Sequence, residues 1–111
     1  MELTEYIPDD SFLSAPTTVR AVFKAGASCE KLTPLMFDSE DKNALVAWDG
    51  TNAAVAISAR QVTESTEEQV LPIYSAGGFR ISFINWPESV STDKQKRAVF
   101  LGSAVYVDDE Y

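Results

Sequence analysis

The chain lacks histidine altogether and has a single cysteine, Cys29, among its 111 residues. One cysteine cannot form a disulfide within the chain, and a cysteine-based zinc site needs several. Without histidine, the chain also lacks the commonest general base and the commonest metal ligand. A nucleophilic role for Cys29 therefore has no base to support it, and we expect a small, partly buried apolar residue there.

Long apolar runs and clusters of positive charge are also missing. No apolar run approaches the ~20 residues of a membrane span, and the acidic first residues do not resemble a signal peptide. Seven of the 17 acidic residues lie in the first ten or last four positions, so the body is close to neutral despite a net charge of −8. Nucleic-acid binding needs clustered Lys or Arg. We therefore expect neither a nucleic-acid partner nor a membrane partner.

The sequence contains short apolar segments separated by turn residues, within a length that suits one domain. Asp49-Gly50 lies between two apolar runs, which is a strong signal for a hairpin, and Gly77-Gly78 is typical of a turn. The predicted fold class is mainly β with one short helix (α+β) and much ordered loop. The expected strands are Thr17–Phe23, a segment opened by Pro34, and residues 45–48, 53–59, 70–74, 79–84 and 103–107.

One short helix is expected near the C-terminus. Residues 92–95 have the form of a capping box, in which the Thr92 hydroxyl accepts a backbone N–H and Gln95 reaches back. Gly102 stands where a helix stop is expected. The predicted helix, 93–101, is too short to persist alone, so we expect it to pack on the body through Ala98 and Leu101.

The N-terminal part differs in composition from the rest. Residues 1–16 contain acids and two prolines and predict an extended arm, so we divide the chain into an arm with its connecting loop, 1–31, and a body, 32–111. The strand pattern of Thr17–Phe23 suits β-augmentation, in which main-chain hydrogen bonds to the edge of a partner's sheet supply affinity. The alternative is that this strand pairs within its own domain.

Four motifs follow one another in the order found in a known family: Thr33-Pro34-Leu35-Met36 leading to Trp48-Asp49-Gly50-Thr51; residues 74–80; Trp86-Pro87-Glu88; and residues 100–105. Together they resemble the head decoration proteins of lambda-type tailed phages, over residues 32–105. Ala76 stands where that family usually has Ser. The first ~30 residues depart from the family's usual Thr/Ala/Pro/Gly-rich arm.

The resemblance implies a β-clip-like body and a structural protein rather than an enzyme, without a cofactor. It implies a homotrimer on the outer surface of the expanded phage head, made in the host cytoplasm, that contacts the major capsid protein and stabilises the shell against internal DNA pressure. It also favours the N-terminal segment as the capsid-binding arm, with Thr17, Thr18, Val19, Arg20, Ala21, Val22 and Phe23 as candidate residues. The residues expected in the core or the trimer interface are Pro34, Leu35, Met36, Trp48, Asp49, Gly50, Tyr74, Phe79, Trp86, Pro87, Phe100 and Gly102.

Other interpretations of the same residues stay open. Trp48, Trp86 or Tyr74 could serve as an exposed stacking platform in a small monomeric β-module that binds a soluble ligand such as a carbohydrate. A hydrolase would need two convergent carboxylates, and no pair stands out. The remaining charged groups have simpler explanations: Asp38, Glu40, Asp41 and Asp49 as turn formers, and Lys94, Lys96 and Arg97 as the solvated face of the helix.

Overall fold

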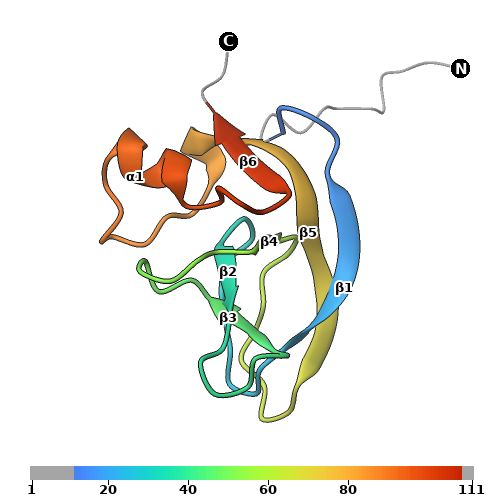
Figure 1. Cartoon of the computed structure of the whole chain (residues 1–111). Helices are drawn as coiled ribbons and strands as arrows, with labels where there is room; N and C mark the ends of the chain where they lie inside the picture. Colours follow the sequence, from blue (N-terminus) through green and yellow to red (C-terminus); the bar gives the residue numbers. More distant parts are fainter. Residues whose placement is uncertain (1–11, 109–111) are drawn as a thin grey trace, which may run out of the picture.

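The computed structural model describes residues 12–108. Within them it confirms a mainly β fold with one short helix (Figure 1). The strands are β1 (Thr17–Phe23), β2 (Pro34–Phe37), β3 (Leu45–Ala47), β4 (Ala56–Ser58), β5 (Gln69–Arg80) and β6 (Val105–Asp108); a 3-10 turn, η1 (Ile81–Phe83), and helix α1 (Asp93–Ala98) lie between β5 and β6.

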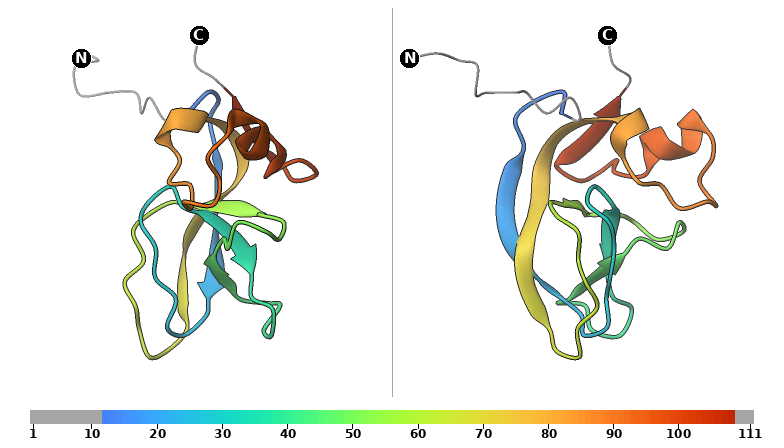
Figure 2. Two further views of the ribbon diagram at one scale, coloured as in Figure 1. Left: turned by 90° about the vertical axis from the view of Figure 1, so that its left-hand side faces the viewer. Right: turned by 180° about the vertical axis from the view of Figure 1, so that it is seen from behind.

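The six described strands form one sheet in the order β1-β3-β2-β4-β5-β6. Because β1 also pairs with β5, the sheet curls into a small barrel-like body. Figures 1 and 2 show β1 and β5 as two long curved ribbons side by side, with the short strands β2, β3 and β4 facing them. The C-terminal strand β6 continues the sheet by pairing in parallel with the far end of β5.

Two clusters of buried side chains fill the body. The first lies under α1 and β6 and includes Trp48, Ile57, Phe79, Phe100 and Val105. The second lies between the lower parts of β1 and β5 and the short strands, and consists of Phe23, Leu35, Leu45, Ala56, Val62 and Ile73. Both clusters draw residues from segments far apart in the chain, so neither could form before the long-range strand pairing.

The predicted hairpin around Asp49-Gly50 is wrong, although the turn itself is present. Strands β3 and β4 do not pair with each other, because β2 lies between them and pairs antiparallel with both. Gly50 has a positive φ of 92°, and its backbone turns the chain across the end of β2. The two apolar runs are therefore the flanks of a three-stranded unit, not the arms of one hairpin.

The predicted turn at Gly77-Gly78 is also wrong, and of the predicted strand at 79–84 only Phe79 and Arg80 are in a strand. Strand β5 runs unbroken through both glycines and ends at Arg80, and the next residues form η1. The glycines serve close packing instead. A β-carbon on Gly77 would stand 2.8 Å from Cα of Pro16, and one on Gly78 would overlap the Tyr106 ring.

The helix has the predicted start but a different packing face. Both halves of the capping box are present between Thr92 and Gln95, and α1 ends at Ala98, before the predicted position. Ala98 is exposed and Leu101 is 80% exposed, so neither anchors the helix as we expected. The segment is held instead by Phe100, which is 1% exposed, because the chain turns inward directly after the helix.

Candidate interaction surfaces

The predicted partner-binding strand is part of the chain's own sheet. Strand β1 pairs antiparallel with β5 over all seven of its residues, from Thr17 opposite Ala76 to Phe23 opposite Gln69. This pairing packs Ala21 and Phe23 into the second core cluster. Thr17–Phe23 is therefore not the free strand that we expected, because its apolar face is needed inside the body. The rest of the predicted arm, residues 1–11, lies outside the described residues.

The other edge of β1 is open in the part of the chain that the structure describes. On that side only Phe23 has a strand partner, Leu45 of β3. Residues 17–20 are all exposed, and Val19 keeps 43% of its surface exposed. An unpaired edge presents a row of backbone N–H and C=O groups that can accept another strand. The open edge of β1 is thus a candidate surface for β-augmentation.

The first and last described residues meet at one end of the molecule (Figure 1). Phe12 forms a bridge with Phe79, and Leu13 donates to the Gly78 carbonyl at 2.8 Å. On the opposite edge, β6 pairs with residues 77–80 of the same strand. Ser14 joins the two sides, because its Oγ accepts from the Gly78 N–H at 2.9 Å and lies 3.3 Å from the Tyr106 hydroxyl.

The aromatic residues of three motifs come together in the first core cluster. The rings of Trp48 and Trp86 meet edge to face at 6.5 Å, and Phe100 lies 6.3 Å from Trp86. Trp48 Nε1 donates to the Asn52 carbonyl and Trp86 Nε1 to that of Ile81. Lys96 lies 5.9 Å above the Trp86 ring. These contacts place the motifs in the core, where a ligand could not stack on Trp48.

The remaining motif residues are also structural. Pro34 and Leu35 are fully buried, with Met36 packed partly against the core. Tyr74 and Phe79 lie 5.5 Å apart and both contact Phe12. Gly50 packs against Pro87 and Ser89, which joins the first motif to the third, and Gly102 has a positive φ of 94°. The Trp86–Pro87 peptide is trans. Trp48 is 8% exposed and Trp86 and Tyr74 are half-buried, so none of the three is fully exposed as the alternative of a stacking platform requires.

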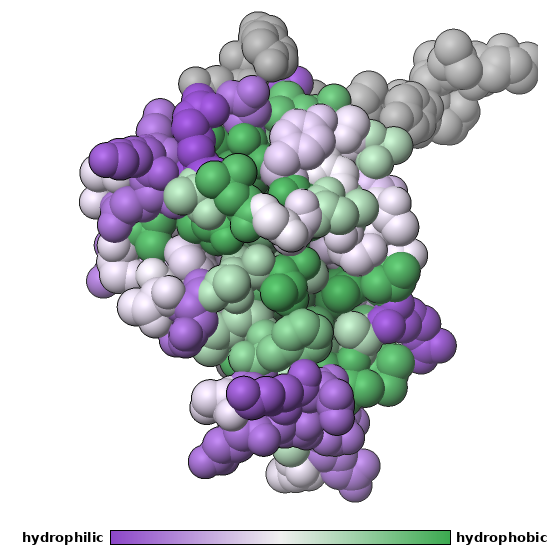
Figure 3. All heavy atoms as spheres, viewed as in Figure 1, coloured by the Kyte–Doolittle hydropathy of each residue, from purple (hydrophilic) through white to green (hydrophobic). Residues whose placement is uncertain are grey.

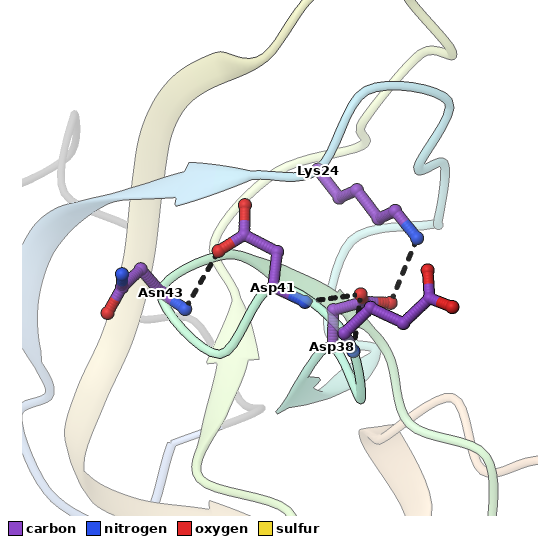
Figure 4. A network of polar contacts seen from close by, with 5 residues as sticks. Lys24, Asp38, Asp41 and Asn43 are labelled. Carbon is purple, nitrogen blue, oxygen red and sulfur yellow. Dashed lines mark hydrogen bonds and ion pairs between the residues drawn. The ribbon is translucent and has the colours of Figure 1, made fainter.

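Two aspartates organise polar turns, as the sequence predicts. The Asp38 carboxylate accepts from the backbone N–H groups of Asp41 and Glu40 and from Lys24 Nζ at 3.2 Å (Figure 4). These hydrogen bonds lower the pKa of Asp38, and the one from the Asp41 N–H has the largest effect. The backbone N–H groups of Thr51 and Asn52 lower the pKa of Asp49 from 3.8 to about 2 in the same way. Both carboxylates are committed to loop structure.

Cys29 is half-buried and forms a backbone bridge with Val62. Burial raises the pKa of its thiol, which opposes formation of the reactive thiolate.

Among residues 12–108, no group of three or more acidic or cysteine side chains could hold a metal ion. In the same part of the chain, no helix is both long and apolar enough to cross a membrane.

One face of the molecule has an exposed apolar area (Figure 3), which the sequence did not indicate. Figure 3 shows apolar residues gathered at its centre, with polar residues over α1 and at the opposite end. Two shallow depressions of about 400 and 370 Å³ lie on the described surface and share Asn52 and Ala53 in their walls. Phe37, 49% exposed, lines the first, and Leu101 lines the second. Their exposure depends on the fold, so no local pattern could have revealed it.

Comparisons with known proteins agree with the resemblance drawn from the motifs. The family model described as bacteriophage lambda head decoration protein D matches residues 12–106. A protein of Escherichia phage N15 that is named as a decoration protein is 36% identical over 81 residues, which cover 73% of this chain and 73% of that protein. The family match begins at Phe12 and so includes β1 and the segment before it.

Proposed function

This chain belongs to the family of the bacteriophage lambda head decoration protein D, and from that membership we propose that it binds the outer surface of the expanded phage head as a homotrimer. There it stabilises the shell against the pressure of the packaged DNA. The partner is the major capsid protein of a tailed phage. The observation that carries the proposal is the family match, which spans nearly all the described residues.

The capsid contact is proposed at the end of the molecule where residues 12–16 lead into β1. The open edge of β1 can accept a strand of the capsid protein, since its backbone groups on that side have no strand partner from Thr17 to Val22 among the described residues. Strand addition supplies affinity through main-chain hydrogen bonds and tolerates variation in side chains. This supports a contact made by shape and backbone pairing.

Three linked copies make such a contact strong enough to act on a shell. A single small contact binds weakly, because ordering the chain at the contact costs conformational entropy. In a trimer the second and third contacts become intramolecular, which raises avidity by about 10²–10⁴-fold. A ligand that binds only the expanded shell stabilises it by mass action, by about 2.7 kcal/mol per site at a hundredfold excess over its Kd.

The direct test mixes the purified protein with empty expanded capsids and images the shells. We expect added density at the threefold positions and a higher temperature of shell disruption. A chain lacking residues 1–11 keeps every described strand and tests whether that segment is needed for attachment. Deletion through Phe23 is unsuitable, because it removes β1 and a residue that is 1% exposed in the core. Shells that stay bare with the full chain would refute the proposed function.

A matched pair of substitutions tests the β1 edge. Val19→Lys places a charge beside the open edge, and charged side chains on an edge oppose strand addition. Val70→Lys is the control, because Val70 is 50% exposed but belongs to β5, on the side of β1 away from its open edge. We expect Val19→Lys alone to lose capsid binding. Equal binding by both variants would show that β1 is not the contact.

A further inference from the structure

Leu101 is the most exposed of the large apolar side chains among residues 12–108. It is 80% exposed and lies in the turn after α1, just before Gly102, which has a positive φ of 94°. The neighbouring Phe100 is fixed in the core, so the position of Leu101 is held by a rigid anchor. Leu101 is therefore an exposed apolar side chain in a fixed position, which another molecule could contact.

The depression beside Phe37 has a partly apolar wall, which could accept an apolar side chain. Its wall combines Met36, Phe37, Ala53 and Val55 with the polar residues Asp38 and Lys42. Phe37 keeps 49% of its surface exposed although it belongs to β2 in the middle of the sheet. The depression holds about 400 Å³ and is open to solvent. It is large enough to receive an aliphatic side chain from another molecule.

Leu101 and the depression belong to the same chain and cannot meet within it. They occupy adjacent parts of one face, with Asn52 and Ala53 in the wall between them. A contact between two different patches of identical chains is heterologous, and such contacts close into rings when the patches face neighbouring directions. Patches on opposite faces would instead give a filament. The two patches share a wall and so do not lie on opposite faces, which favours a closed assembly over a filament.

The charges around the two patches are complementary. Helix α1 carries Lys94, Lys96 and Arg97 against the single acid Asp93, and Arg97 forms an ion pair with Asp108 at 2.7 Å, which leaves the two lysines as the basic groups of this side. Lys94 lies four residues before Ala98, so the two share one side of α1, and Ala98 lines the same depression as Leu101. The loop beside Phe37 carries Asp38, which is paired with Lys24, and two further acids, Glu40 and Asp41, against one base, Lys42. Seating Leu101 beside Phe37 would bring Lys94 towards that acidic loop.

We propose that copies of this chain associate head to tail, with Leu101 of one copy seated in the Phe37 depression of the next, and that three such contacts close the ring. The inference rests on the proposed homotrimer and names the surface through which its copies meet. The acidic loop at 38–42 and the basic side of α1 set the orientation, because the reversed contact would oppose like charges. The β1 edge stays outside this contact and remains available to the capsid.

The sharpest test uses two charged substitutions at exposed positions. Leu101→Asp leaves the Phe37 depression intact, and Phe37→Asp leaves the Leu101 projection intact. We expect each variant alone to be monomeric by native mass spectrometry, with association weakened about tenfold or more, as for a central interface anchor. Mixed together, the two variants have one intact contact between them and should form a 1:1 heterodimer that cannot close. Association of either variant alone as in the wild type, or failure to pair on mixing, would overturn the proposal.

Disulfide crosslinking tests independently which residues meet across the contact. In a Cys29→Ser background, Leu101→Cys combined with Phe37→Cys should give oxidised trimers on a non-reducing gel. Each single cysteine should give almost none, because a head-to-tail contact never places two identical positions together. Efficient crosslinking by Leu101→Cys alone would indicate a symmetric contact and refute the head-to-tail arrangement.

Charge exchange tests the orientation. Lys94→Glu and Glu40→Lys should each weaken association, and the double variant should recover it, more completely at low salt. Absence of recovery would place the two residues apart.

Capsid imaging with the same variants separates the two proposals. Variants that associate normally yet leave shells bare refute the proposed function alone, whereas shells decorated normally by the unpaired Leu101→Asp variant refute this surface alone.

Discussion

Gly78, near the C-terminal end of β5, lies directly against the ring of Tyr106 in β6, so closely that a β-carbon at residue 78 would overlap the ring. The same glycine donates its N–H to Ser14 Oγ at 2.9 Å, and the Tyr106 hydroxyl lies 3.3 Å from that oxygen. Three segments far apart in the chain are thus joined at one point. The contact holds together the end of the molecule at which we propose the capsid is bound.

A double-mutant cycle tests this contact. Gly78→Ala should lower the free energy of unfolding by about 1–3 kcal/mol, the usual cost of overpacking. In a Tyr106→Ala background the same change should be neutral or stabilising, because the obstructing ring is gone and alanine suits a strand better than glycine. Urea unfolding followed by tryptophan fluorescence measures all four proteins. An equal cost in both backgrounds would contradict the contact.

Gly77 should respond differently from its neighbour. Its φ is +123°, and the obstacle to a β-carbon is the Pro16 backbone rather than a mobile side chain. Gly77→Ala should therefore cost about 1–3 kcal/mol through backbone strain, and Tyr106→Ala should not relieve it. The same unfolding assay checks this, and a cost that Tyr106→Ala abolishes would show that the two glycines act through one contact.

Stability should depend on pH through Asp49. Its pKa falls from 3.8 to about 2 in the folded chain, so the folded state favours the ionised carboxylate. The contribution is complete above pH 3.8 and is lost as the pH falls through about 2. Asp49→Asn should flatten the urea midpoint between about pH 4 and pH 2 relative to the wild type. Glu67→Gln, an exposed acid in another loop, serves as the control and should leave that slope in place.

The capping box gives a prediction for the helix. Thr92→Ala removes the oxygen that accepts the Gln95 N–H at 3.2 Å. Loss of an N-cap costs about 1 kcal/mol, which corresponds to a fall in Tm of roughly 4–8 °C for a domain of this size. Ser91→Ala is the neighbouring control, because only the backbone of Ser91 takes part in the cap. Similar Tm values for both variants would argue against the cap.

Two adjacent residues should differ sharply in their effect on folding. Phe100→Ala removes a ring that is 1% exposed in the first core cluster and should cost about 3–5 kcal/mol. Leu101→Ala removes a side chain that is 80% exposed and should change the stability of the monomer by less than about 0.5 kcal/mol. Urea unfolding at low protein concentration measures both. A large loss for Leu101→Ala there would mean that Leu101 packs within the chain.

The sequence by itself determined the fold class, the helix start and the polar turns. The capping box at Thr92 and the carboxylates of Asp38 and Asp49 act on backbone groups two or three residues away. Such local hydrogen bonds need only the right residue at the right spacing. The order of the aromatic motifs identified the family for a related reason, since Trp48, Trp86 and Phe100 form one core and cannot vary independently.

Only the tertiary structure decided which strands pair and which residues are left exposed. The segment before Asp49 pairs with β2 rather than across the turn, β1 pairs with β5, and the glycines of β5 pack instead of turning. Each outcome depends on residues from distant parts of the chain competing for the same edge or the same space. Exposure of Phe37 and Leu101 has the same origin, because a side chain is left outside only once the rest of the chain has filled the core.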